Sequence, residues 1–267
     1  MKKMIAALVV VTAMLLNVPA FAGEAEAKTD VGLNVELQYA TAYVFRGLNL
    51  FDTSDQMAQN MLLAPAINWS IFDTGLVLGY WSAWQLNGDN KSYNVDAGVG
   101  HEQDLILSYN VGLGETMALG AGLVYYFYPF ADKDTAGTSV PSYLEPYVDF
   151  KFSFILDLGA KVAYYYGVQD AIEMYRYLYL SPYIGKSFDL LDIVGLGFKV
   201  SYGYKLWNDS DMEDNTHDVT LTVDAPIKLG KMFYVIPHVD AAWTNLPLVD
   251  FKDEYVIFGG VTAGVNF

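Results

Sequence analysis

The sequence predicts an all-β protein, a transmembrane antiparallel up-and-down β-barrel of about 12 strands. Three observations predict it. The 267 residues are 53% hydrophobic and only 17% charged, whereas a soluble domain carries about 25% charged residues. Apolar and polar residues alternate with a period of two, in segments that recur about every 20 residues along the chain. Tight and long connections between these segments also alternate, as they do between the two ends of an outer-membrane barrel.

The N-terminal segment has the features of a secretory signal peptide. Lys2 and Lys3 supply positive charge, residues 4–16 are mainly apolar, and an A-x-A cleavage pattern ends at Ala22. An uncleaved membrane anchor is the alternative, but the apolar run is short compared with the roughly 20 residues that a spanning helix needs. The predicted organisation is a signal peptide at 1–22, an N-terminal periplasmic extension at 23–32 and a transmembrane β-barrel at 33–267.

Composition excludes several classes of function. The formal charge is −16 and the 15 Lys and Arg residues are scattered, which argues against nucleic acid because phosphates are bound by clustered basic side chains. The chain has no Cys, so zinc-thiolate sites, disulfide scaffolds and thiol nucleophiles are excluded. The large apolar fraction also excludes a disordered chain.

The first barrel segment, 33–46, shows the alternation on which the strand predictions depend. It reads LNVELQYATAYVFR, in which the odd-numbered positions from Leu33 to Phe45 are mainly apolar, while Glu36 and Arg46 are among the polar even-numbered positions. The same pattern predicts strands at 33–46, 60–71, 75–86, 91–113, 117–129, 142–156, 159–168, 174–186, 193–207, 215–226, 231–243 and 254–267.

The segment 91–113 is long for one spanning strand and contains the polar run HEQD at 101–104. Splitting it there would move every later loop to the opposite side of the membrane. We therefore expect one strand with a bulge or with an extension beyond the membrane. The resulting even number of strands leaves both chain ends in the periplasm.

The connections follow from these strands. Tight connections, expected in the periplasm, lie at 72–75, 157–159 and 228–231, and longer ones, expected outside, at 47–59, 87–91, 130–141, 169–173, 208–215 and 244–254. Aromatic residues near strand ends are expected to form interfacial girdles: Tyr43, Phe45, Trp81, Trp84, Tyr125 to Tyr128 and Tyr202 to Trp207. For Tyr165, Tyr177 and Tyr179, parity leaves two alternatives open, girdle anchoring or an inward position where rings stack sugars or nucleosides.

Acidic residues recur in the long loops. They are Asp52, Asp55, Asp89, Asp132, Asp134, Asp170, Glu173, Asp250 and the stretch 208–215. We interpret 208–215 as a solvated acidic loop, because it lacks the Gly and the bidentate Glu of a calcium-binding loop. An acidic rim of this kind concentrates cations or binds lipopolysaccharide phosphates through divalent ions, so outer-membrane lipid and lipopolysaccharide are expected partners.

Charged residues of both signs share the polar parity of the predicted strands. Because a mid-membrane Arg or Lys facing lipid costs about 2–4 kcal/mol, we expect them in the lumen. The predicted pore-lining residues are Glu36, Arg46, Asp96, Glu145, Asp149, Lys151, Lys161, Lys199, Lys205, Asp218, Asp224, His238 and Asp240. Two interpretations stay open: a channel with a transverse field that orients polar solutes, or an ion-pair network that closes a narrow barrel.

No motif for enzyme catalysis stands out. His238 and Asp240 share a strand face, as in a Ser-His-Asp lipase, but the chain has no G-x-S-x-G elbow, and a lumen imidazole is the simpler interpretation. No H-E-x-x-H motif occurs, and His101 and His217 have no partner at metal-ligand spacing. We therefore expect no catalytic residues, no cofactor and no bound metal.

Several short motifs resemble a known family. The stretch Tyr43-Val44-Phe45-Arg46-Gly47 resembles the TorF-like (Gcw_chp) family of outer-membrane porins, although Thr41-Ala42 stands where that family has Ser-Asp. Further blocks that resemble the family are YNVDAGVG at 93–100, GLVYYFYP at 122–129 and YLEPY at 143–147. The resemblance implies an outer-membrane barrel with a channel function and no established substrate, and it supplies no catalytic residues. The last strand ends on Phe267 and resembles the signal that directs barrel proteins to the barrel-assembly machinery, which is therefore an expected partner.

These observations predict a channel in the bacterial outer membrane for passive diffusion of small hydrophilic solutes, with selectivity set by lumen charges. The alternative is a closed structural or adhesive barrel, whose acidic outer loops bind surface partners or divalent-bridged lipopolysaccharide.

Overall fold

The computed structural model describes residues 31–51, 61–86, 100–129, 142–168, 176–207, 216–245 and 255–267, with the backbone alone at 100 and 101. None of the described residues form a helix long and apolar enough to cross a membrane.

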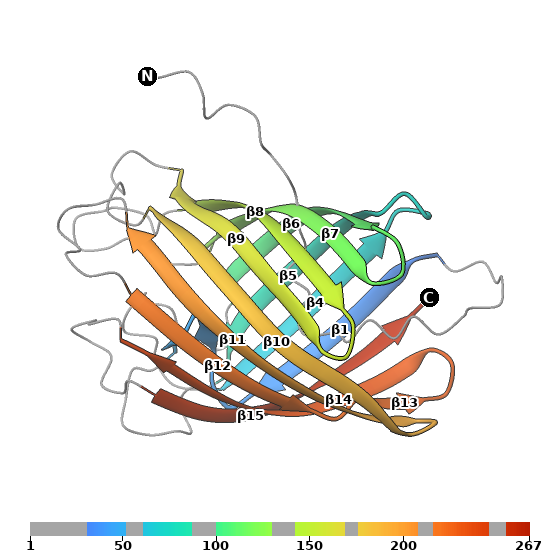
Figure 1. Ribbon diagram of the computed structural model, residues 1–267. Coiled ribbons are helices and arrows are strands. Elements are labelled where there is room, and N and C mark those ends of the chain that lie inside the picture. Colours follow the sequence, from blue (N-terminus) through green and yellow to red (C-terminus); the bar gives the residue numbers. More distant parts are fainter. Residues whose placement is uncertain are drawn as a thin grey trace.

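Twelve long antiparallel strands close into a barrel (Figure 1). Their bounds are β1 Leu33–Ala40, β4 Leu62–Ser70, β5 Leu76–Gln85, β6 Gly100–Gly112, β7 Met117–Phe127, β8 Tyr143–Ser153, β9 Asp157–Gly167, β10 Tyr177–Leu191, β11 Val194–Trp207, β12 Thr216–Asp224, β14 Phe233–Thr244 and β15 Tyr255–Asn266. Each strand pairs with its neighbours in this order, and β1 pairs with β15 to close the barrel, for example Leu37 opposite Ala263. The short β13 (Ile227–Leu229) pairs with β14 and, at one position, with β11. The predicted fold class is confirmed.

The outward face of the barrel is apolar. In β8, for example, Phe150 points outward and is 41% exposed, whereas Glu145 points inward and is 0% exposed. Exposed apolar side chains surround the barrel: Leu37, Ile67, Leu78, Leu105, Leu107, Val162, Ile184, Phe198, Val200, Leu221, Val239 and Ile257. An apolar belt of this extent requires lipid around it, so the protein is a transmembrane barrel of the bacterial outer membrane.

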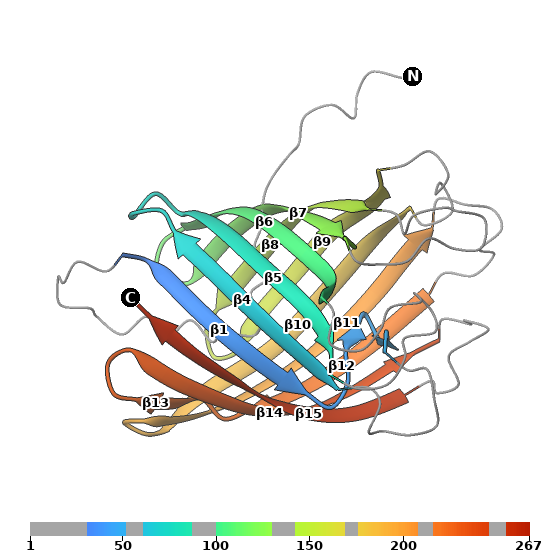
Figure 2. The same cartoon turned by 180° about the vertical axis from the view of Figure 1, so that it is seen from behind.

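The short connections, the beginning of β1 and the C-terminus lie at the same end of the barrel (Figures 1 and 2). The turn between β8 and β9 differs from the prediction, which placed it at 157–159. It lies at 154–156, because Asp157 already pairs with Ser153 across the hairpin. The predicted turn at 228–231 also begins two residues too early, since Lys228 belongs to β13.

The long segment 91–113 contributes one strand, β6. Its pairing with β5 shifts register at Ala83 and Trp84, which pair with Glu102 and Gly100. The sequence predicts one strand with a bulge or with an extension beyond the membrane; the described residues show one strand with the bulge, and residues 91–99 lie outside them. The bulge leaves the parity of every later strand as predicted.

The first predicted strand is wrong at its C-terminal end. β1 ends at Ala40, and the chain then turns into the barrel and forms a two-stranded hairpin, β2 (Val44–Phe45) and β3 (Leu48–Asn49). We call residues 43–51 the lumen hairpin. The prediction placed Tyr43 and Phe45 in an outer girdle and 47–51 in an outer loop, whereas in the structure Tyr43 and Phe51 are buried inside the barrel.

Backbone geometry allows the hairpin to turn. Arg46 and Gly47 have φ angles of +51° and +82°, in the left-handed region that glycine adopts readily. The ends of the hairpin are joined by a hydrogen bond from the Leu50 amide to the Tyr43 carbonyl, at 2.7 Å. A period-two pattern cannot reveal such an exit from the barrel wall, because the alternation of apolar residues continues through Tyr43 and Phe45.

Candidate functional site

Arg46, at the tip of the lumen hairpin, contacts the wall formed by β8 and β10. Its guanidinium forms an ion pair with Glu145 and donates a hydrogen bond of 2.6 Å to the Tyr177 hydroxyl. It also lies over the ring of Tyr179, at 4.1 Å from the ring centre. Glu145 is completely buried and binds a second cation, Lys161, at 2.9 Å. Because Arg is protonated under all ordinary conditions, the Arg46 side of this contact is always positively charged.

A second tie joins the hairpin backbone to β11 and β12. The Lys205 ammonium donates a hydrogen bond of 3.0 Å to the Arg46 carbonyl and lies 3.5 Å from Asp218. The Tyr179 hydroxyl donates to the same Asp218 carboxylate at 3.0 Å. Buried charges are stable only when paired and hydrogen bonded, as they are here. The hairpin tip is thus held by two sets of contacts, from Arg46 to β8 and β10 and from Lys205 of β11 to the hairpin backbone.

The base of the hairpin contacts the opposite wall. The Tyr43 hydroxyl donates a hydrogen bond of 2.9 Å to Glu102 of β6. The Tyr43 ring packs against Trp81 of β5, with ring centres 5.5 Å apart, and against Phe51, at 5.2 Å. The hairpin therefore crosses the lumen and contacts strands on both sides.

Aromatic rings form a ladder on the inner wall. Tyr165 stacks on Tyr143 and Tyr177, with ring centres 4.5 and 5.1 Å apart, and Tyr177 packs against Trp207 at 4.7 Å. The register pairs Tyr165 with Tyr177 across β9 and β10. Tyr165, Tyr177 and Tyr179 thus point inward, which decides between the two positions that parity left open. The ladder is continuous with Phe45 of the hairpin, which lies 6.4 Å from Tyr165.

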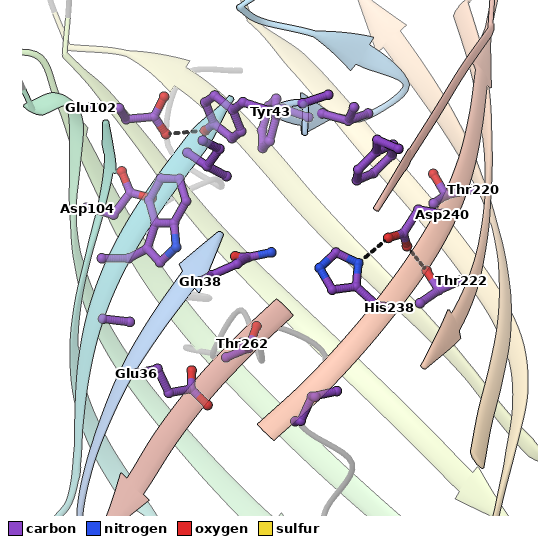
Figure 3. A pocket seen from close by; sticks show the side chains of 18 of the residues that line it. Glu36, Gln38, Tyr43, Glu102, Asp104, Thr220, Thr222, His238, Asp240 and Thr262 are labelled. Carbon is purple, nitrogen blue, oxygen red and sulfur yellow. Dashed lines mark hydrogen bonds and ion pairs between the residues drawn. The ribbon is translucent and has the colours of Figure 1, made fainter. Parts of the chain in front are cut away.

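A cavity of about 300 Å³ lies between the lumen hairpin and the wall formed by β1, β4 to β6, β12, β14 and β15. Glu36, Glu102 and Asp104 lie on one side of it, and His238 and Asp240 on the other (Figure 3). Rings of Tyr43, Phe45, Trp81, Tyr126 and Phe258 also line it.

The structure brings several predicted pore-lining residues together and separates others. By strand register the inward face carries Glu36, Glu145, Asp149, Lys151, Lys161, Lys199, Lys205, Asp218, Asp224, His238 and Asp240. Arg46 lies on the hairpin instead of on a wall strand, and Asp96 lies outside the described residues. Lys199 lies over the Tyr183 ring at 4.7 Å, and Lys151 reaches Asp157 at 3.6 Å near the short turn between β8 and β9.

Two acidic residues of the lumen, Glu102 and Asp104, are absent from the pore-lining set that the sequence predicts. Both are 3% exposed and share the inward face of β6 with Ile106 and Ser108. Their signal is the alternation of 102, 104, 106 and 108, but the polar run at 101–104 is interpreted from the sequence as a bulge or an extension beyond the membrane.

His238 is part of a lumen hydrogen-bond network. Its Nδ1 atom lies 2.5 Å from Asp240, whose carboxylate also accepts a hydrogen bond of 2.6 Å from Thr222. Its Nε2 atom, which would bind a serine nucleophile, has no hydrogen-bond partner among the described residues. The described part of the chain also contains no cluster of three or more His, Asp or Glu side chains able to hold a metal ion.

Comparison with known proteins shows the fold. No family model and no curated protein sequence matches the chain. Among solved structures, the KdgM porin is similar over 88% of this chain and 99% of its own, with a TM-score of 0.54 and 13% identity. An outer-membrane channel from Pseudomonas putida F1 is similar over 92% of this chain and 98% of its own, with a TM-score of 0.50 and 12% identity. At these identities the likeness establishes an outer-membrane barrel architecture.

Proposed function

We propose that the protein is an outer-membrane channel for passive diffusion of small hydrophilic solutes, with the lumen hairpin as its narrowest zone and lumen charges as its selectivity determinant. The observation that carries the proposal is the segregation of the side chains. The outer face is apolar, while the inner face carries charged and polar groups around a cavity of about 300 Å³. A barrel with only a structural role has no need of charged groups along its lumen, since each costs desolvation energy.

The charges are also distributed unevenly around the lumen. The inward basic side chains of the wall lie on β8, β9 and β11, namely Lys151, Lys161, Lys199 and Lys205, where Glu145, Asp149 and Asp218 offset part of their charge. Glu36 on β1 and the pair Glu102 and Asp104 on β6 belong to the other part of the wall. This arrangement supports a transverse field that orients solutes carrying a dipole.

Reversing the charge of Lys151 and Lys199 is expected to shift ion selectivity toward cations. These two lysines are suitable because Lys151 pairs with Asp157 and Lys199 lies over the Tyr183 ring, both on the barrel wall, so Lys151→Glu with Lys199→Glu changes the field at the wall. Reversal potentials in planar bilayers under a salt gradient measure the effect. Lys228→Glu, on the exposed periplasmic β13, is the control and should leave the reversal potential unchanged. Equal reversal potentials for the double variant and the wild type would contradict selection by lumen charge.

Membership of the TorF-like family is part of the proposal, supported by the Tyr43 to Gly47 motif, which forms the tip and one side of the lumen hairpin. The signal peptide at 1–22 and the extension at 23–32 are proposed on sequence grounds. The barrel-assembly machinery is a proposed partner through the strand that ends at Phe267, and lipopolysaccharide is one through the acidic outer loops.

A closed structural or adhesive barrel is the second candidate, and the lumen hairpin is the observation that favours it. In that case the folded protein does not conduct, and deletion of an acidic outer loop abolishes surface binding. For a channel, the same deletion leaves permeability in place.

A further inference from the structure

The cavity beside the lumen hairpin contains buried polar atoms that have no partner. Glu36 and Asp104 are each 3% exposed, and one carboxylate oxygen of each lacks a hydrogen-bond partner among the described residues. The indole N–H of Trp81, a side chain that is 7% exposed, likewise has no hydrogen-bond acceptor among the described residues. One oxygen of Asp224 is also unpaired. All four side chains line this cavity.

The cavity also has an excess of negative charge. Glu36, Glu102 and Asp104 form no ion pair with any described residue. Glu36 accepts a hydrogen bond from Tyr234 and Glu102 accepts one from Tyr43, while Asp104 lies next to Glu102. The two basic side chains that line the cavity are engaged elsewhere. Arg46 is paired with Glu145, outside the cavity, and His238 with Asp240.

Water can satisfy unpaired acceptors, but it does not neutralise several carboxylates that face one low-dielectric space. A cation with N–H donors does both. The aromatic rings of the lining, among them Tyr43, Trp81 and Tyr126, favour an organic cation over a hydrated metal ion, because they attract positive charge and pack against methylene groups.

We propose that this cavity is a binding site for small alkylammonium compounds. The site rests on the proposed function only in lying within the channel lumen, where it would hold a permeating amine beside the hairpin. Acidic side chains on two facing walls, Asp104 of β6 and Asp224 of β12, suit a ligand with an ammonium group at each end. The volume of about 300 Å³ accommodates a short aliphatic diamine.

Isothermal titration calorimetry of the purified, detergent-solubilised protein with 1,4-diaminobutane tests the proposal. Saturable binding is expected, with no binding of 1,4-butanediol, which has the same length and no charge. Asp104→Asn keeps the shape of the side chain and should weaken diamine affinity by about tenfold or more, as should Glu102→Gln, because each removes a charged acceptor from a buried site. Asp149→Asn removes an inward carboxylate of β8 that does not line the cavity, and should change affinity by less than about twofold.

Binding that Asp104→Asn leaves intact in a correctly folded variant would overturn the proposed site, as would absence of binding to the wild type. Magnesium chloride that binds as tightly as the diamine, with the same response to Asp104→Asn, would overturn the assignment to an organic cation. The channel proposal fails separately. Diamine binding without conductance in bilayers contradicts the channel and leaves the site, whereas conductance without diamine binding contradicts the site alone.

Discussion

Replacing Arg46 with alanine is expected to increase single-channel conductance and to destabilise the barrel. Arg46 supplies the ion pair with Glu145, the hydrogen bond to Tyr177 and the contact with the Tyr179 ring. Without it, the hairpin tip loses its ion pair with β8 and its hydrogen bond to β10, and the contact of Lys205 with the residue 46 carbonyl and the packing of Phe45 beside Tyr165 remain. The lumen hairpin should then leave its position for much of the time.

The stability cost follows from the charges that remain. Removing one partner of a buried ion pair costs about 3–5 kcal/mol, because the other charge stays buried. Here Glu145 keeps Lys161 at 2.9 Å, so we expect a loss of about 3 kcal/mol in the free energy of unfolding, near the lower end of that range. Urea unfolding in detergent micelles measures it, and planar bilayers measure the conductance.

Arg176→Ala is the matched control for Arg46→Ala. The Arg176 guanidinium lies over the ring of Tyr166, on the outer parity of β9, at 4.4 Å. Its removal should leave the conductance steps unchanged. If Arg46→Ala produced the same steps as Arg176→Ala, the hairpin would not be the constriction.

Gly47→Ala should displace the lumen hairpin by steric exclusion. A Cβ atom on Gly47 would lie 2.8 Å from the Cβ atoms of Asp218 and Thr244 and 2.9 Å from the Trp243 carbonyl oxygen. These are backbone and near-backbone atoms of β12 and β14, which cannot move aside without disrupting the wall. The φ angle of +82° adds strain of its own, about 1–2 kcal/mol for a residue with a side chain.

Two other glycines separate the clash from the backbone strain. Gly114 and Gly230 have φ angles of +79° and +86°, and a Cβ at either would meet nothing within 4 Å. Gly114→Ala and Gly230→Ala should therefore lose only about 1–2 kcal/mol and keep wild-type conductance. Gly47→Ala should lose more than either and should show the enlarged conductance of Arg46→Ala. A Gly47→Ala protein indistinguishable from Gly114→Ala would mean that the hairpin tip does not occupy this position.

Much of the barrel was predictable because lipid imposes a strict pattern on its strands. An inward charge such as Lys161 and an outward neighbour such as Val162 cannot exchange places without a large cost, so parity predicts which side chains of a strand face the lumen. The prediction of one strand within 91–113 follows from the alternation of short and long loops, because a split there would move every later loop to the opposite side of the membrane.

The lumen hairpin was not predictable from that pattern. Its position depends on contacts between residues distant in sequence, such as Arg46 with Glu145 and Lys205 with the Arg46 carbonyl. Alternation reports which face a residue occupies within a strand, and it does not report where the strand leaves the wall. Arg46 was correctly expected in the lumen, but as part of the wall rather than as the side chain that reaches across to it.

The central claim is that the barrel conducts and that the lumen hairpin limits the conductance. The most direct test is planar-bilayer recording of the purified wild-type protein, with its folded state verified by heat-modifiable gel migration, beside Arg46→Ala prepared in the same way. We predict discrete conductance steps for the wild type and larger steps for Arg46→Ala. Folded wild-type and Arg46→Ala proteins that both insert and produce no steps would contradict the account.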